Sequence, residues 1–69
     1  MRLTQEREAV GWSRAELARQ ANMNAGTIGH IESGRLRPYP GQLSKIAAAL
    51  GFAGDPATLL DEVPDEHAG

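Results

Sequence analysis

The residues with the most chemistry to offer in this chain are cations and small polar side chains that could bind an anion. Arg14 stands at the start of one expected helix, and Asn24 and Thr27 stand at the start of the next. Arginine can hold a phosphate through two hydrogen bonds, and backbone N–H groups at a helix start attract phosphate. A basic and aromatic group follows, consisting of Arg35, Arg37, Tyr39 and Lys45. This group favours contact with the phosphates of a polyanion, although such residues also occur as ordinary solvated surface and capping residues.

Catalytic chemistry is not predicted. The absence of cysteine excludes disulfides and thiolate metal sites. The two histidines, His30 and His67, lie far apart and have neither a nucleophile nor a carboxylate at motif spacing. Ser13 is needed as a helix cap, and no glycine-rich phosphate loop is present. We therefore expect no enzyme activity, no metal and no cofactor.

Charge is divided unevenly along the 69 residues, which carry a formal net charge of −2. Residues 1–54 hold all seven Lys and Arg residues against four acids, so this part carries +3. Residues 55–69 hold five acids and no base, so this part carries −5. A basic body with an acidic tail favours a nucleic-acid partner. We expect one domain over residues 1–63 and a flexible acidic tail over residues 64–69.

Two capped helices joined by a tight turn are predicted over residues 13–32. Ser13 with Glu16 three residues later forms a capping box, so a helix begins directly after Ser13. Asn24 is a good cap for the following helix, and Asn22 tolerates the left-handed backbone that a sharp turn requires. Such a pair is a helix-turn-helix, and its second helix enters a DNA groove when the unit binds DNA.

Three further helices complete an all-α prediction. Residues 4–10 form a short first helix, Pro40 begins a fourth helix, and Asp55 with Pro56 begins a fifth. The expected core draws on every helix and consists of Leu3, Val10, Trp12, Leu17, Ala18, Met23, Ile28, Ile31, Leu43, Ile46, Ala47, Leu50, Phe52 and Leu59. The apolar residues near the fifth helix exceed what its docking needs, so we expect a possible homodimer interface through Phe52, Leu59, Leu60 and Val63.

The residues resemble the helix-turn-helix proteins of the phage repressor and Cro type. The matching segments are GWSRAELARQA, TIGHIESGRLRPYP and LSKIAAALGF. The resemblance implies a five-helix, lambda-repressor-like DNA-binding domain with the helix-turn-helix at helices 2 and 3. It also implies an ion pair between Arg7 and Glu32, which we assign to structure because a buried charge left alone costs about 3–5 kcal/mol.

The chain departs from this family in two ways. Asn22 occupies the turn position where the family usually has glycine. Arg14 stands where the family commonly has glutamine, and Ala25, Gly26 and His30 stand where it commonly has polar side chains. Ala25 can offer a methyl group to thymine, and His30 can donate to a guanine or a phosphate. Few long side chains are therefore left to read bases.

The resulting prediction is a sequence-specific regulator that occupies operator DNA as a repressor. The predicted contacts with double-stranded DNA are Arg14, Asn24, Ala25, Gly26, Thr27, His30, Arg35, Arg37, Tyr39 and Lys45. The alternative is a protein-interaction module whose acidic tail and fifth helix engage a toxin, recombinase or polymerase subunit. No apolar run approaches the roughly 20 residues that span a bilayer, so we expect a cytoplasmic protein without membrane contact.

Overall fold

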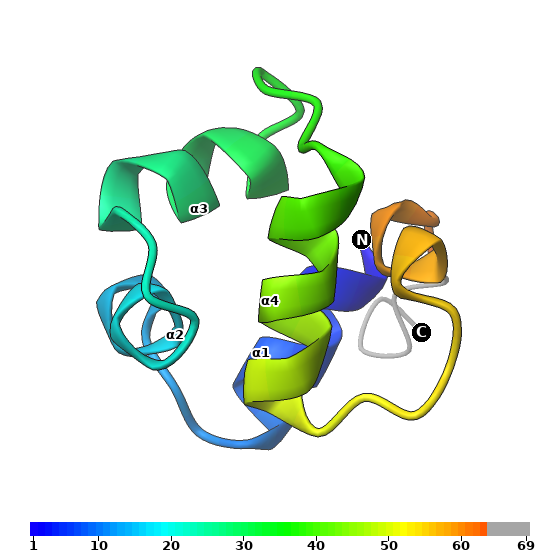
Figure 1. The fold of residues 1–69 in the computed structure, drawn as a ribbon, viewed down its shortest axis with the longest axis horizontal. Helices are drawn as coiled ribbons and strands as arrows, with labels where there is room; N and C mark the ends of the chain where they lie inside the picture. The colour runs from blue at the N-terminus through cyan, green and yellow to red at the C-terminus, as the bar shows by residue number, and fades with distance from the viewer. Residues whose placement is uncertain (64–69) are drawn as a thin grey trace, which may run out of the picture.

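The two central helices begin where their caps predict. The computed structural model describes residues 1–63, and within them α2 spans Arg14–Gln20 and α3 spans Ala25–Glu32 (Figure 1). Ser13 Oγ accepts a hydrogen bond from the backbone N–H three residues on, at 3.0 Å. Asn24 Oδ1 accepts one from the N–H two residues on, at 2.7 Å. Both helix starts are confirmed, because each cap satisfies an N–H that the helix itself cannot.

The turn between α2 and α3 depends on a left-handed asparagine. Asn22 has a φ of 56°, and among residues 1–63 it is the non-glycine residue with positive φ. Met23 N donates to Ala18 O at 2.7 Å, which closes the turn on the end of α2. Left-handed backbone costs most residues about 1–2 kcal/mol, and asparagine tolerates it better than most. The prediction for Asn22 is confirmed.

The second half of the predicted capping box is different in the structure. The Glu16 carboxylate accepts hydrogen bonds from Arg19 Nη2 at 2.5 Å and from Gln20 Nε2 at 2.8 Å. It is therefore directed along the exposed side of α2, because a cation and an amide one turn ahead offer charge-assisted and neutral donors.

The remaining elements are α1 over Arg2–Ala9, α4 over Pro40–Leu50 and a 3₁₀ helix, η1, over Pro56–Leu60. The expected count of five α-helices is therefore not confirmed, since the fifth element is a short 3₁₀ helix. Its predicted cap is present, with Asp55 Oδ1 accepting from Ala57 N at 3.0 Å. The helix ends at extended Asp61, whose carbonyl accepts from the backbone N–H of residue 2 at 2.9 Å. Short runs of this kind are where 3₁₀ geometry is common.

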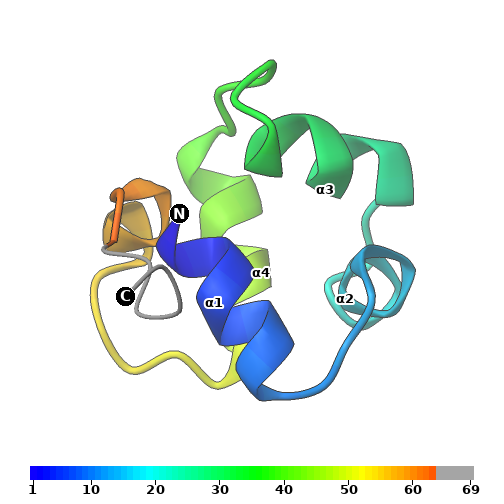
Figure 2. The ribbon, with the colours of Figure 1, turned by 180° about the vertical axis from the view of Figure 1, so that it is seen from behind.

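All five elements contribute to one core. α2 packs on α3 and α4, and η1 packs on α1 and α4 (Figures 1 and 2). The buried apolar residues are Leu3, Leu17, Ala18, Ala21, Ile28, Ile31, Leu43, Ile46, Ala47 and Leu59. Full burial of one such large side chain stabilises the fold by roughly 1.5–3 kcal/mol relative to leaving it exposed.

Two apolar predictions were wrong. Val10 is 45% exposed because α1 ends at Ala9 and left-handed Gly11 turns the chain away from the buried face. Leu59 is 0% exposed and belongs to the core, so it cannot line a dimer interface. The other residues of that expected interface, Phe52, Leu60 and Val63, are half-buried. Trp12, Met23, Leu50 and Phe52 are also half-buried and pack against the core from outside it.

The domain boundary at residue 63 stays a prediction, because the expected acidic tail over residues 64–69 lies outside the described residues. In the described part of the chain, every helix is too short or too polar to cross a membrane.

Candidate nucleic-acid interface

Helix α3 presents small residues on its outer face. Ala25, Gly26 and His30 are exposed, whereas Ile28 and Ile31 are buried. At about 100° per residue these two groups lie on opposite sides of the helix. α3 lies at an edge of the molecule, with the loop that follows it projecting at the same edge (Figures 1 and 2). An extended object can therefore approach the outer face of α3.

The two glycines of α3 have different surroundings. A Cβ added at Gly26 would lie 3.0 Å from Asn24 Oδ1, the atom that caps the helix. A Cβ added at Gly29 would meet nothing within 4 Å. Gly26 therefore makes room for the cap. Gly29 instead lowers helix stability by about 1 kcal/mol relative to alanine and leaves its backbone open to the outside.

The loop of residues 35–39 is held against the end of α3. Arg35 N and Leu36 N donate to His30 O at 2.9 and 3.1 Å. Tyr39 is 75% exposed, and its backbone N–H donates to Gln42 Oε1 at 2.9 Å, which caps α4. Backbone hydrogen bonds therefore hold exposed Arg35 at the end of α3 and exposed Tyr39 at the start of α4.

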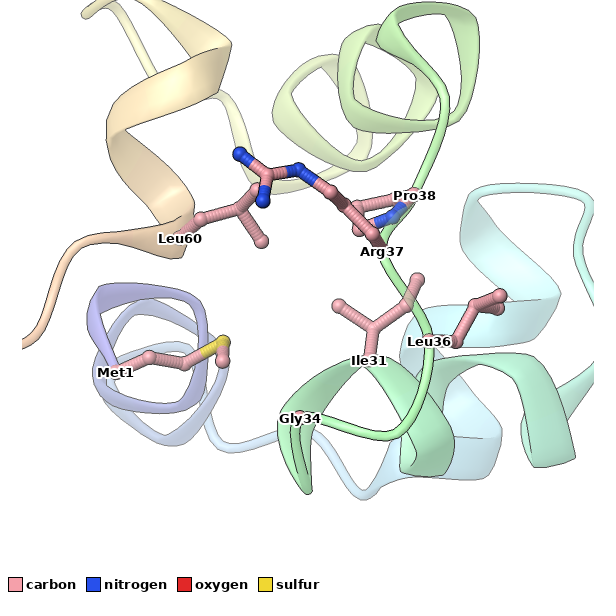
Figure 3. A pocket seen from close by; sticks show the side chains of 7 residues that line it. All are labelled: Met1, Ile31, Gly34, Leu36, Arg37, Pro38 and Leu60. Atoms are coloured by element: carbon pink, nitrogen blue, oxygen red, sulfur yellow. The ribbon is translucent and has the colours of Figure 1, made fainter.

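Arg37 is directed elsewhere. Its side chain starts beside buried Pro38 and extends toward Leu60 of η1 (Figure 3). These three residues line a hollow of about 270 Å³ together with Met1 and the end of α3, and they line a second hollow of about 390 Å³ together with α4 and η1. The structure thus places Arg37 at η1, whereas the sequence grouped it with the α3 flank.

The other predicted contacts lie at the start of α3 and on α4. Asn24 is exposed but uses its side-chain oxygen as the cap, and Thr27 is half-buried. Lys45 is exposed two residues after buried Leu43, which puts it on the side of α4 away from the core.

Arg14 has a partner that the sequence did not reveal. Its Nε donates to Glu32 Oε1 at 3.3 Å. The Arg14 side chain is 57% exposed, while the Glu32 side chain is 1% exposed. Arg14 therefore connects the surface to a buried carboxylate at the end of α3.

The Glu32 carboxylate joins three helices. Arg7 Nε donates to Glu32 Oε2 at 2.8 Å, and Arg7 Nη2 donates to Oε1 at 3.1 Å. Thr4 Oγ1 also donates to Oε1, at 3.1 Å, and Arg7 Nη1 donates to Trp12 O at 2.7 Å. Thr4 lies three residues before Arg7 on α1, so its helical spacing was the one sequence signal for this role.

These contacts set the protonation of the pair. Burial by itself raises the pKa of Glu32, but the hydrogen bonds from Arg7, Arg14 and Thr4, together with the charge of Arg7, outweigh it and lower that pKa. The hydrogen bond from Arg7 to Glu32 raises the pKa of Arg7 despite its burial. Glu32 is therefore held as a carboxylate and Arg7 as a cation.

In the described part of the chain, no group of three His, Cys, Asp or Glu side chains is placed to hold a metal ion. The candidate site is instead a surface of exposed cations, small residues and backbone around α3.

Comparison with known proteins found one family. A family model described as a helix-turn-helix domain matches residues 1–60. This match covers all four α-helices and η1. Searches of curated proteins and of solved structures gave no significant match.

Proposed function

The chain belongs to the helix-turn-helix domain family, and from this premise we propose that it binds double-stranded DNA and regulates transcription. We further propose the finer role of a small repressor of the Cro type that occupies an operator, and we expect no enzymatic activity. The observation that carries this proposal is the outer face of α3, which is exposed, bears no side chain larger than that of His30 and lies at an edge of the molecule. A major groove admits an α-helix presented in this way.

Base reading in this proposal relies on short groups. Ala25 offers a methyl group to thymine, and His30 can donate to a guanine. Gly26 and Gly29 let the α3 backbone approach the groove floor. Specificity would therefore draw on water-mediated contacts and DNA shape as well as on direct hydrogen bonds.

Phosphate contacts would supply most of the affinity. Arg14, Arg35, Tyr39 and Lys45 are exposed and carry side-chain hydrogen-bond donors, and Asn24 is exposed at the start of α3. The backbone N–H of Thr27 donates to Asn24 O at 3.0 Å, so the Thr27 hydroxyl is the donor it would offer to a phosphate. Cation contacts of this kind make the dissociation constant strongly dependent on salt. Arg37 would contribute less in this complex, because its side chain extends toward Leu60.

A mobility-shift assay with a labelled duplex of random sequence, repeated across salt concentrations, tests the proposal. We expect binding that weakens steeply as salt rises, followed by enrichment of one motif when bound duplexes are selected and sequenced. Arg19→Ala is the matched control, because Arg19 is an exposed cation of α2 that pairs with Glu16. Binding of no duplex at low salt would overturn DNA recognition, and binding without enrichment would remove the operator role.

A second candidate is a protein-interaction module. It is favoured by Leu60 and Arg37, which share the walls of both hollows and so place an apolar side chain beside a cation. A truncated chain that ends at residue 63 is compared with the full chain to separate the two candidates. If the truncated chain binds DNA more tightly, the acidic tail opposes DNA binding. If the truncated chain loses a protein partner that the full chain captures, the interaction role gains support.

A further inference from the structure

Arg14 joins a buried carboxylate to the surface. The Arg14 Nε–H donates a hydrogen bond to Glu32 Oε1 at 3.3 Å. The guanidinium is planar and rigid, so holding Nε restricts the plane in which both terminal nitrogens lie. The Arg14 side chain as a whole is 57% exposed, so a ligand can reach it from solvent.

The carboxylate that holds Arg14 is already neutralised by another cation. Arg7 donates to both oxygens of Glu32, at 2.8 and 3.1 Å, from the buried side. Two guanidinium groups and one carboxylate leave the cluster with a net charge of +1, and Arg14 is its exposed member. Glu32 can therefore orient Arg14 without cancelling its attraction for an anion.

We propose that Glu32 positions Arg14 so that the Nη1 and Nη2 atoms of Arg14 bind one phosphate of the DNA backbone in a two-point contact. This inference rests on the proposed DNA-binding function and names the partner of one residue within it. Arg14 touches the phosphate, whereas Glu32 is a positioning residue that acts through Arg14. The planar fork of arginine matches two phosphate oxygens, and restricting its rotation before binding lowers the entropy lost on contact.

The first test compares substitutions of Arg14 on a labelled duplex of random sequence. Arg14→Lys keeps the charge but offers a single ammonium, so we expect about tenfold weaker binding with an unchanged salt slope. Arg14→Gln removes the charge, so its slope of log affinity against log salt should fall by about 0.9. Arg19→Lys is the control, because Arg19 lies about 140° around α2 from Arg14. It should bind like the wild type.

The second test asks whether the effect passes through Glu32. In a Glu32→Gln background, Arg14→Lys should weaken binding by only about twofold, because arginine has lost the group that orients it. Thr4→Val is the matched background, since it removes another donor to Glu32 Oε1 without touching Arg14. In that background the tenfold loss should persist. Circular dichroism establishes that each variant is folded under the binding conditions.

A third measurement needs neither DNA nor a substitution of Glu32. In ¹⁵N spectra of the free protein, the Arg14 Nε–H should exchange with water more slowly than the Nε–H of exposed Arg35. Equal exchange rates, or equal affinity of wild type and Arg14→Lys for DNA, would overturn the positioning of Arg14. An undiminished tenfold loss in the Glu32→Gln background would overturn the part played by Glu32. Failure of the wild type to bind any duplex is a different result, and it overturns the proposed function itself.

Discussion

Arg7 binds Glu32 through two hydrogen bonds, with Nε at 2.8 Å from Oε2 and Nη2 at 3.1 Å from Oε1. The two side chains are 10% and 1% exposed. This contact joins α1 to the last residue of α3, and Thr4 of α1 and Arg14 of α2 also donate to the same carboxylate. The relative placement of α1 and α3 therefore depends on a charge pair as well as on apolar packing.

Replacing Arg7 should destabilise the fold strongly. In Arg7→Met the Glu32 carboxylate keeps its burial but loses its main partner, so the free energy of unfolding should fall by about 3–5 kcal/mol. Urea denaturation followed by circular dichroism measures this change. Arg19→Met is the control, because the exposed pair of Arg19 with Glu16 should contribute little to stability. Equal denaturation midpoints for the two variants would contradict a structural role for the Arg7–Glu32 pair.

Stability should fall in acid because of Glu32. The folded state lowers the pKa of Glu32 below its ordinary value of 4.5, so the unfolded chain binds a proton more readily. The contribution of Glu32 is therefore complete above about pH 4.5 and is lost as the pH falls through the folded pKa. Urea midpoints measured between neutral and acid pH should decline most steeply there. Glu32→Gln should make this decline of the urea midpoint with falling pH less steep. An equally steep decline in the variant would show that Glu32 is not its cause.

The turn should respond to the backbone preference of its central residue. Asn22 has a φ of 56°, where a Cβ without a polar side chain is unfavourable. We expect Asn22→Ala to lower the free energy of unfolding by about 1 kcal/mol, whereas Asn22→Gly should not lower it. Thermal and urea unfolding of both variants measure the difference. If alanine were tolerated as well as glycine, the turn would not depend on left-handed backbone.

The two glycines of α3 should behave differently on substitution. Gly29→Ala should raise the free energy of unfolding by about 1 kcal/mol, because its Cβ meets nothing within 4 Å. Gly26→Ala should raise the free energy of unfolding by less, because the new Cβ would lie 3.0 Å from Asn24 Oδ1 and disturb the cap. Equal stabilities would contradict this account. On the proposed function, Gly29→Ala should also weaken DNA binding although it stabilises the free protein.

His30 and Arg35 should affect DNA binding in different ways. Arg35→Ala should weaken binding to every duplex and reduce its salt dependence, as expected for a phosphate contact. His30→Ala should change the preference for particular bases, which sequencing of selected duplexes detects. If His30→Ala weakened binding equally on all sequences, His30 would be a phosphate contact.

The sequence by itself determined the local elements of this protein. The starts of α2 and α3, the left-handed turn at Asn22 and the start of α4 at Pro40 all follow from interactions within a few residues. A cap satisfies an N–H two or three positions away, and proline restricts its own backbone angle. Such local features can be predicted without knowing which segments of the chain are in contact in the folded protein. The pattern of Leu17, Ile28 and Ile46 indicated the core for the same reason, since helical spacing alone puts them on inward faces.

Only the tertiary structure decided which partners the charged residues have. Glu32 binds Arg14, Arg7 and Thr4, which lie 18, 25 and 28 residues away along the chain. The family resemblance suggested Arg7, but no local spacing could bring Arg14 or Thr4 to the same carboxylate. The direction of Arg37 toward Leu60 likewise depends on where η1 docks. These properties depend on the packing of segments distant in sequence, which local propensity and periodicity do not encode.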